Sequence, residues 1–206
     1  MQSFTLDSQK LYTALASVGI SRSDDKLRPL LNAVLVEMES PDVLRFVATD
    51  SFRMAIADIK VDNIAFECSE NKSFEPFNLA GDFKPLLAML KTDKQSSRVI
   101  VDGSNVIVST KNGAQVVVDR LEGTFPGYRD IVKHATVQEG LAEEVAFNPA
   151  YMGDIGKAAM LFSGETRKNT KTPVRFSSNG KNKPGRFLVV SNDDTLEQWL
   201  MPTRVL

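Results

Sequence analysis

Apolar and polar residues alternate in short runs at the start of the chain, and one helical stretch lies among them. SFTLD (residues 3–7) alternates as a strand does, and after it Leu11, Leu15 and Val18 recur at the spacing of a helix face. Ser8 is expected to cap this helix. Three further strand-like runs follow at residues 27–38, 43–50 and 52–59. The predicted order of elements is β-α-β-β-β.

The same order is predicted twice more. In the second copy a strand at residues 73–80 precedes a helix at 82–92, with Asp82 as its expected cap and Pro85 in its first turn. Its three strands fall at residues 97–103, 105–110 and 114–123, joined by hairpin turns. The third copy has a strand at 143–150, a helix at 150–163 and strands at 172–178, 185–192 and 196–206. Gly153 and Gly156 weaken that helix by about 1 kcal/mol each.

Three copies of one β-α-β-β-β unit predict an α+β fold with antiparallel sheets. The simpler alternative is an ordinary α+β domain in which the repeated order is a coincidence. Residues 132–140 (VKHATVQEG) are polar and are interpreted as a linker, so His134 is expected to be solvated there.

The composition of the chain excludes several kinds of functional site. The chain has 206 residues, 42% of them hydrophobic, and a formal net charge of -1, so any basic surface must be segregated on one face. A single Cys68 and a single His134 cannot supply the four ligands of a structural zinc site. No apolar run reaches the roughly 20 residues that span a bilayer, and no export signal or phosphate-binding glycine motif is recognisable. We therefore expect a protein of the cytoplasm that has no metal or other cofactor and is not an enzyme.

Three motifs carry a resemblance to a known family. RPLLNAVLVEM followed by LRFVATDSFRMA, then LEGTFPGYRDIV, and finally LMPTRVL occur in that order between residues 27 and 206. They resemble the bacterial-type DNA polymerase sliding clamp, the β subunit of the replicative polymerase. The resemblance implies a DNA-clamp fold, in which helices line a ring and antiparallel sheets form its outer wall. It also implies a processivity factor that encircles duplex DNA at the replication fork, in a bacterial or virus-infected bacterial cell.

The chain is shorter than the family's members, which have three domains of two units and close a ring of twelve units from two chains. We expect residues 1–128 to form a complete domain, 129–141 a linker, and 142–206 half a domain that a neighbouring subunit completes. Four chains of three units would restore twelve, so the resemblance implies a homotetramer in preference to a trimer.

The resemblance also implies a hydrophobic groove that receives short peptides from the polymerase and the clamp loader. Carried over position by position, the groove uses the turn between two strands and the C-terminal tail: Thr49, Ser51, Phe52, Arg53, Met54, Met201, Pro202, Thr203, Arg204 and Val205. Arg53 is expected to orient the turn or the peptide rather than bind DNA. Met54 and Met201 would otherwise be ordinary core residues.

The predicted helices and their following loops, residues 8–26, 82–94 and 149–171, carry ten Lys/Arg against six Asp/Glu. This excess fits a mildly positive lining that faces phosphates without reading sequence. The candidate DNA-facing residues are Lys10, Arg22, Lys26, Lys84, Lys91, Lys94, Lys157, Arg167 and Lys168.

Two other functions remain open from the sequence. One is a clamp-like protein that binds or sequesters clamp-binding peptides without closing a ring. The other is a metal-dependent nuclease that would use Asp50, Asp58 and Asp119, although these carboxylates lack a metal-binding spacing.

Overall fold

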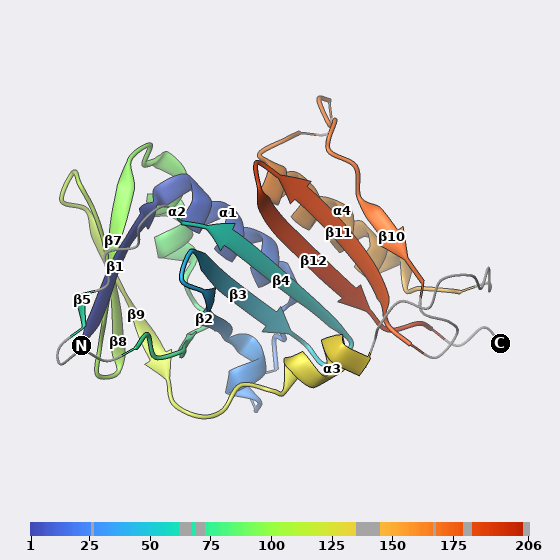
Figure 1. The fold of residues 1–206 in the computed structure, drawn as a ribbon, viewed down its shortest axis with the longest axis horizontal. Coiled ribbons are helices and arrows are strands. Elements are labelled where there is room, and N and C mark those ends of the chain that lie inside the picture. Colours follow the sequence, from blue (N-terminus) through green and yellow to red (C-terminus); the bar gives the residue numbers. More distant parts are fainter. Residues whose placement is uncertain are drawn as a thin grey trace.

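The strands join in one sheet that runs through the whole molecule. The structure is a computed structural model, and it describes residues 1–25, 27–61, 67–68, 73–134, 145–166, 168–178 and 183–203. The twelve strands are arranged in the order β10-β11-β12-β4-β3-β2-β6-β9-β8-β7-β1-β5, and every pair is antiparallel. Figure 1 shows helices α1, α2 and α4 on one side of the strands and α3 on the other.

The elements fall into three units of similar order. Unit one contains β1 (Gln2–Asp7), α1 (Ser8–Val18), β2 (Val34–Ser40), β3 (Val43–Thr49), β4 (Arg53–Lys60) and β5 (Glu67–Cys68). Unit two contains β6 (Phe77–Leu79), α2 (Lys84–Thr92), β7 (Ser96–Asp102), β8 (Asn105–Thr110) and β9 (Gln115–Leu121). Unit three, defined as residues 145–203, contains α4 (Pro149–Ser163), β10 (Arg175–Ser177), β11 (Gly185–Ser191) and β12 (Asp194–Leu200). The predicted α+β fold of repeated β-α-β-β-β units is confirmed.

Units one and two exchange their first strands. β1 of unit one pairs with β7 of unit two, and β6 of unit two pairs with β2 of unit one. Each first strand also pairs with the last strand of its own unit, β1 with β5 and β6 with β9. The two units are therefore related by an approximate twofold axis and close around a shared core.

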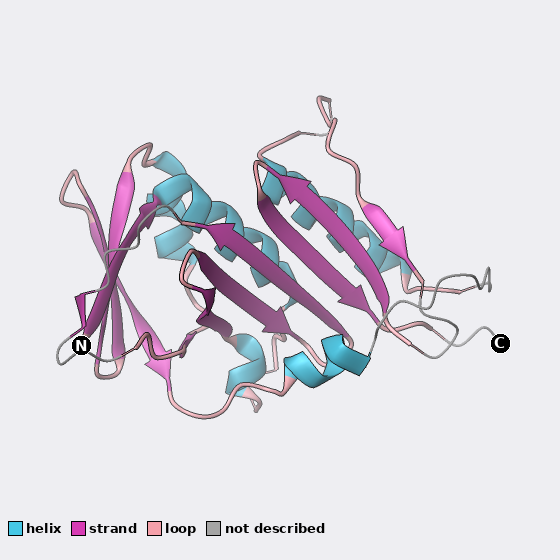
Figure 2. Ribbon diagram, in the orientation of Figure 1, coloured by secondary structure: helices cyan, strands magenta, loops and turns pink. Residues whose placement is uncertain are grey.

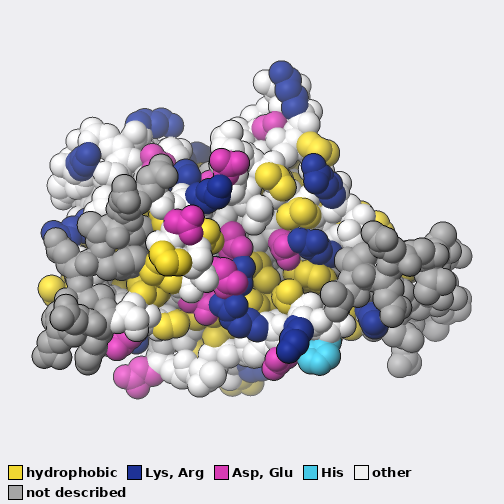
Figure 3. All heavy atoms as spheres, viewed as in Figure 1, with side chains coloured by type: hydrophobic (Ala, Val, Ile, Leu, Met, Phe, Trp, Pro, Cys, Tyr) yellow, Lys and Arg dark blue, Asp and Glu magenta, His cyan; other side chains and the backbone are white. Residues whose placement is uncertain are grey.

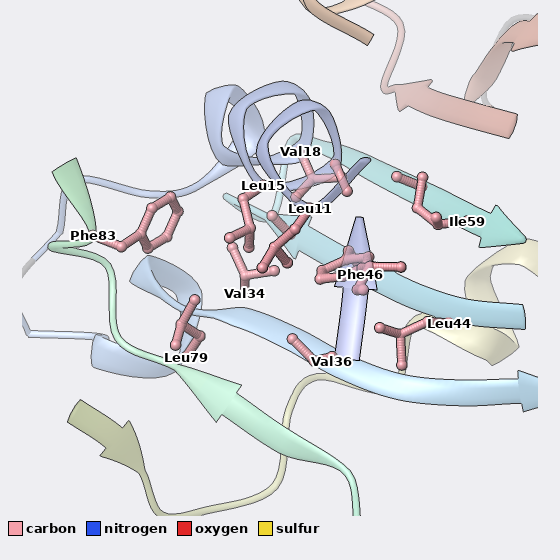
Figure 4. Packing of buried hydrophobic residues seen from close by; sticks show 14 of the residues in the cluster. Leu11, Leu15, Val18, Val34, Val36, Leu44, Phe46, Ile59, Leu79 and Phe83 are labelled. Atoms are coloured by element: carbon pink, nitrogen blue, oxygen red, sulfur yellow. The ribbon is translucent and has the colours of Figure 1, made fainter. Parts of the chain in front are cut away.

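This core lies between the sheet and its three inner helices. Leu11, Leu15 and Val18 from α1 point onto β2 and β3, where Val36 and Phe46 meet them (Figure 4). Burial of each such side chain contributes about 1.5–3 kcal/mol. The helical spacing that predicted α1 thus marks the face that packs.

Unit three joins unit one at a sheet edge. β12 pairs with β4 from Thr195↔Asp58 to Leu200↔Arg53, so strands of the two units lie side by side (Figure 2). Helix α4 packs against α1 on the inner side. In the part of unit three that is described, its first strand is reduced to an isolated bridge between Ala146 and Thr203.

Both predicted helix caps are wrong. Asp7 caps α1, because its carboxylate accepts from the N–H groups of Gln9 and Lys10 at 2.9 Å each. Ser8 instead turns inward, and its hydroxyl lies 2.6 Å from the carboxylate of Asp93. At α2 the capping position is Phe83, whose backbone has no side-chain cap; Asp82 makes no capping bond.

Two segments differ from their predicted conformation. The long strand predicted at residues 27–38 begins instead with a 3₁₀ turn, Pro29–Asn32, since proline cannot donate to a ladder. The predicted linker starts as helix α3 (Tyr128–His134), and His134 ends it with Nδ1 2.7 Å from the carbonyl of Asp130. Residues 135–141 of that linker lie outside the described residues. No described helix has the length and apolar character needed to cross a membrane.

Candidate functional site

The turn between β3 and β4 is built by its own side chains. The Asp50 carboxylate accepts from the N–H groups of Phe52 and Arg53 and from Nε of Arg53, each at 2.9 Å. Thr49 Oγ1 donates to the Arg53 carbonyl at 2.7 Å, and Ser51 takes a φ of 80°. Asp50 is therefore a turn-forming residue whose oxygens are already occupied.

Arg53 connects this turn to helix α4. Its guanidinium forms ion pairs with Asp50 and with Asp154 of α4. It also lies 4.6 Å from the ring centroid of Tyr151, in the geometry of a cation–π contact. Arg53 is thus bonded within the turn, which is one of the two roles expected for it, and the sequence carries no signal that α4 supplies the second carboxylate.

An exposed apolar pair lies beside the turn. Phe52 is 60% exposed and Met201 is 43% exposed, and the Met201 N–H donates to the Phe52 carbonyl at 3.1 Å. Pro202 is half-buried next to them and Thr203 is exposed. The two sequence segments predicted to form a groove are thus brought together where β4 begins and β12 ends.

Two predicted groove residues lie beneath this surface. Thr49 is buried, and Met54 is buried in a cluster on the outer side of the sheet with Leu35, Val47, Ile56, Phe125, Tyr128 and Trp199. Met54 is therefore a core residue, and its side chain does not reach the surface formed by Phe52 and Met201. Ser51 is exposed in the turn, whereas Arg204 and Val205 lie outside the described residues.

Five of the predicted basic residues are exposed, on helices α2 and α4 or in the segments after them: Lys84, Lys91, Lys94, Lys157 and Lys168. Two other candidates, Lys10 and Arg22, are bonded to groups of the protein itself. Lys10 donates to the Lys60 carbonyl at 2.9 Å and lies 3.5 Å from Asp194. Arg22 donates to the carbonyls of Gly19 and Asn32, and burial lowers its pKa. Lys26 and Arg167 are outside the described residues.

The comparisons with known proteins decide the family. The model of the DNA polymerase III β subunit, central domain, matches residues 5–127, which is more than half of the chain. This chain belongs to the DNA polymerase III β subunit family. The resemblance inferred from the sequence motifs is confirmed.

Solved structures show that the family's fold extends over all three units of this chain. The β subunit of Thermotoga maritima is 19% identical with a TM-score of 0.73, and the alignment covers 100% of this chain and 66% of that one. The sliding clamp of Bacillus subtilis is 18% identical with a TM-score of 0.71, covering 99% and 64%. For the β subunit of Borrelia burgdorferi the values are 11%, 0.75, 99% and 63%. The chain thus spans slightly less than two thirds of these proteins. No curated protein matches it.

Helix α3 forms a second feature that the sequence did not predict. A cleft of about 270 Å³ lies between α3 and the outer side of the sheet, lined by Glu39, Arg45, Ile56, Tyr128, Arg129, Val132, Lys133 and Glu197. Arg45 donates to both oxygens of Asp58 at 2.7 Å, and Arg129 donates to Glu37 and Glu39 at 2.7 Å each. The bonds of Arg129, together with that of the Tyr128 hydroxyl to Glu37, hold α3 on the outer side of the sheet, where Tyr128 packs in the same cluster as Met54.

Burial and charge act together in this network. Burial raises the pKa of Tyr128 to about 12, and its hydrogen bond to the Glu37 carboxylate acts in the same direction. Burial also works to raise the pKa of Glu39, but Arg129 and Arg45 outweigh it and hold that pKa below its ordinary value. Glu39 is therefore held in its charged form between Arg45 and Arg129, while the Tyr128 hydroxyl stays protonated.

The three carboxylates considered for a nuclease are not brought together. Asp50 is held in its turn and Asp58 on β4 is bound by Arg45, while exposed Asp119 lies on β9, four positions away from β4 in the sheet. Among the residues that the structure describes, no group of three His, Cys, Asp or Glu side chains could hold a metal ion.

Replacement of Arg53 tests whether its ion pairs stabilise the contact between units one and three. We expect Arg53→Ala to lower the free energy of unfolding by about 1–3 kcal/mol, because two partly buried carboxylates lose their partner. The measurement is urea denaturation followed by Trp199 fluorescence. Arg28→Ala is the control, since Arg28 pairs with Asp25 in the open and should cost less than about 1 kcal/mol. Equal losses for the two variants would contradict the role of Arg53.

Proposed function

We propose that this chain is a sliding clamp that encircles duplex DNA and tethers a replicative polymerase. The observation that carries the proposal is the arrangement of the three units, with one continuous sheet on the outside and the three unit helices on the other side. That arrangement is the fold of the bacterial clamps, over almost two thirds of their length. A clamp acts by enclosure and carries out no catalytic step, so the protein needs neither a metal nor another cofactor.

The charge on the helix side supports contact with DNA. Lys84, Lys91 and Lys94 of unit two and Lys157 and Lys168 of unit three are exposed on or directly after α2 and α4. Helix α1, which lies between them, contributes no exposed basic residue, because Lys10 is bonded to Lys60 and Asp194. A modest positive field of this kind attracts phosphates of any sequence and still permits movement along the duplex.

The proposed ring contains four copies. The clamps that this chain resembles close their ring with twelve units, and three units per chain require a homotetramer to reach that number. A trimer would make a smaller ring of nine. Residues 1–128 would then act as one complete domain and unit three as half of another.

The proposed peptide site is the surface around Phe52 and Met201. Two exposed apolar side chains beside a structured turn offer anchors for the apolar residues of a short peptide from the polymerase or the loader. Met201 can repack around different partners because its thioether side chain is flexible. The outer side of the sheet near this surface mixes apolar side chains with basic and acidic ones (Figure 3).

A clamp-like binder that never closes a ring is the second candidate. The observation that favours it is the exposed pair Phe52 and Met201, which can anchor a peptide whether or not a ring closes. Such a protein would keep the peptide surface and lose the topological link to DNA.

Circular and linear DNA separate these two functions. With a clamp loader present, a ring should remain on nicked circular plasmid during gel filtration and leave after the plasmid is cut once, because enclosure ends where the duplex ends. The readout is the amount of protein that elutes with the DNA. Equal retention on both forms, or on neither, would contradict the proposed enclosure.

Shortening the two exposed anchors tests the peptide site. We expect Phe52→Ala and Met201→Ala each to weaken binding of labelled polymerase-derived peptides by about tenfold or more, as loss of a central apolar anchor usually does. Fluorescence anisotropy measures the affinity. Val117→Ala is the matched control, since Val117 is a similarly exposed apolar residue in unit two. Unchanged affinity in both test variants would place the peptide site elsewhere.

Charge reversal tests the helix side. The double variant Lys84→Glu/Lys91→Glu should bind a short linear duplex more weakly and with a salt slope reduced by roughly 2, one unit for each lost phosphate contact. Affinity is measured by anisotropy at several NaCl concentrations. The control double variant is Lys111→Glu/Lys133→Glu, which changes the same charge in the β8–β9 turn and on α3. A lower slope in the control alone would mean that DNA lies against the other side.

A further inference from the structure

Unit three lacks the strand partners that units one and two give each other. In those two units the first strand of each pairs with the first strand after the helix of the other, β1 with β7 and β6 with β2. Among the described residues, Ala146 of unit three pairs with Thr203 alone, and β10 pairs with β11 alone and ends the sheet. Both positions that take part in the exchange are thus open in unit three.

An aromatic side chain is exposed where its counterparts are buried. Phe176 of β10 lies opposite Phe187, which faces α4 in the core of unit three. The corresponding strands of the other two units place Val36 and Val99 on their helix-facing side, at 2% and 3% exposure, whereas Phe176 is 50% exposed. The difference arises because β6 and β1 cover Val36 and Val99, and no described strand covers Phe176.

Helix α4 also exposes an apolar residue whose counterpart on α1 is buried. Met152 comes four residues after the capping Asn148, as Leu11 comes four residues after the capping Asp7 of α1. Leu11 is 3% exposed against the shared core of units one and two, and Met152 is 41% exposed. Side chains at Gly153 and Gly156 would meet no atom within 4 Å, so this part of α4 leaves room for a neighbouring element.

The exposed surface is already ordered. The rings of Phe147, Phe176 and Phe187 contact one another, with centroids 4.9–5.8 Å apart. Gly185 lies directly beneath them, and a Cβ there would be 2.6 Å from the Phe147 ring. A partner would therefore meet a preformed half of a core, which keeps the entropic cost of binding low.

We infer that a second copy of this chain binds here, through a reciprocal exchange in which residues 145–147 of each copy pair with β10 of the other. The occupant follows from the internal twofold axis, because a unit of this type is completed by another unit of the same type. A contact in which one surface meets itself is the usual form of a twofold interface. The inference rests on the proposed ring for its biological purpose and names the partner and the contact by which two half domains become one.

The mass of the purified chain tests this contact without DNA or peptide. The wild-type chain should sediment as an even number of copies at tens of micromolar concentration, and Phe176→Asp should halve that mass, because the charge cannot be buried at the twofold contact. Val190→Asp is the control: Val190 is also exposed on the same hairpin, one residue beyond the inward-facing Val189, and its variant should keep the wild-type mass.

A second measurement guards against a variant that fails to fold. In the wild-type protein, amide hydrogen exchange at Arg175 and Ser177 should slow at high concentration and speed up on dilution. A wild-type chain that stays a single copy, or a folded Phe176→Asp variant with unchanged mass, would overturn the contact. Failure of retention on circular DNA with a mass halved by Phe176→Asp would overturn the ring and support the contact.

Discussion

Hydrogen bonding between strand edges is the interaction on which this molecule depends. A unit of one helix and four short strands cannot cover its own edges, and open edges recruit further strands. β4 of unit one meets β12 of unit three over six residue pairs, and the exchange of β1 and β6 closes units one and two. The result is a sheet that grows by adding units sideways, with the helices kept on one side by their apolar stripes.

The proposed peptide surface is a product of that growth. Phe52 belongs to unit one and Met201 to the end of unit three, and the two meet only because β12 is in register with β4. Arg53 fixes the same junction from the inner side through Asp154 and Tyr151. The proposed peptide surface and the cohesion of the two units therefore depend on one turn, and a change in the register would remove both together.

Local patterns were enough to predict most of this fold, and long-range contacts account for what they missed. Alternation and helical spacing located the three helices of the units and nearly all strands, because apolar residues such as Leu11 and Val36 recur at the positions that face the core. The sequence could not show that Ser8 would turn toward Asp93, that Arg22 would be half-buried and bonded to Gly81, or that Lys10 would be bonded to Lys60. Helix α3 was missed because its stability comes from Tyr128 and Arg129 reaching glutamates some 90 positions earlier in the chain. For the site, the motif predicted which segments meet but left open whether Met54 and Met201 are groove or core residues, and only the structure shows Met54 buried and Met201 exposed.

The antiparallel exchange between units has a consequence for direction. Two units related in this way keep their helices on the same side of the sheet, so the axis that relates them runs through the sheet, and the strands of one point the opposite way from those of the other. A second copy joined to unit three by the same exchange would carry its Phe52 turn on the opposite rim. A ring assembled in this way would have two equivalent faces. A polymerase moving in either direction along the duplex would therefore meet the same peptide surface.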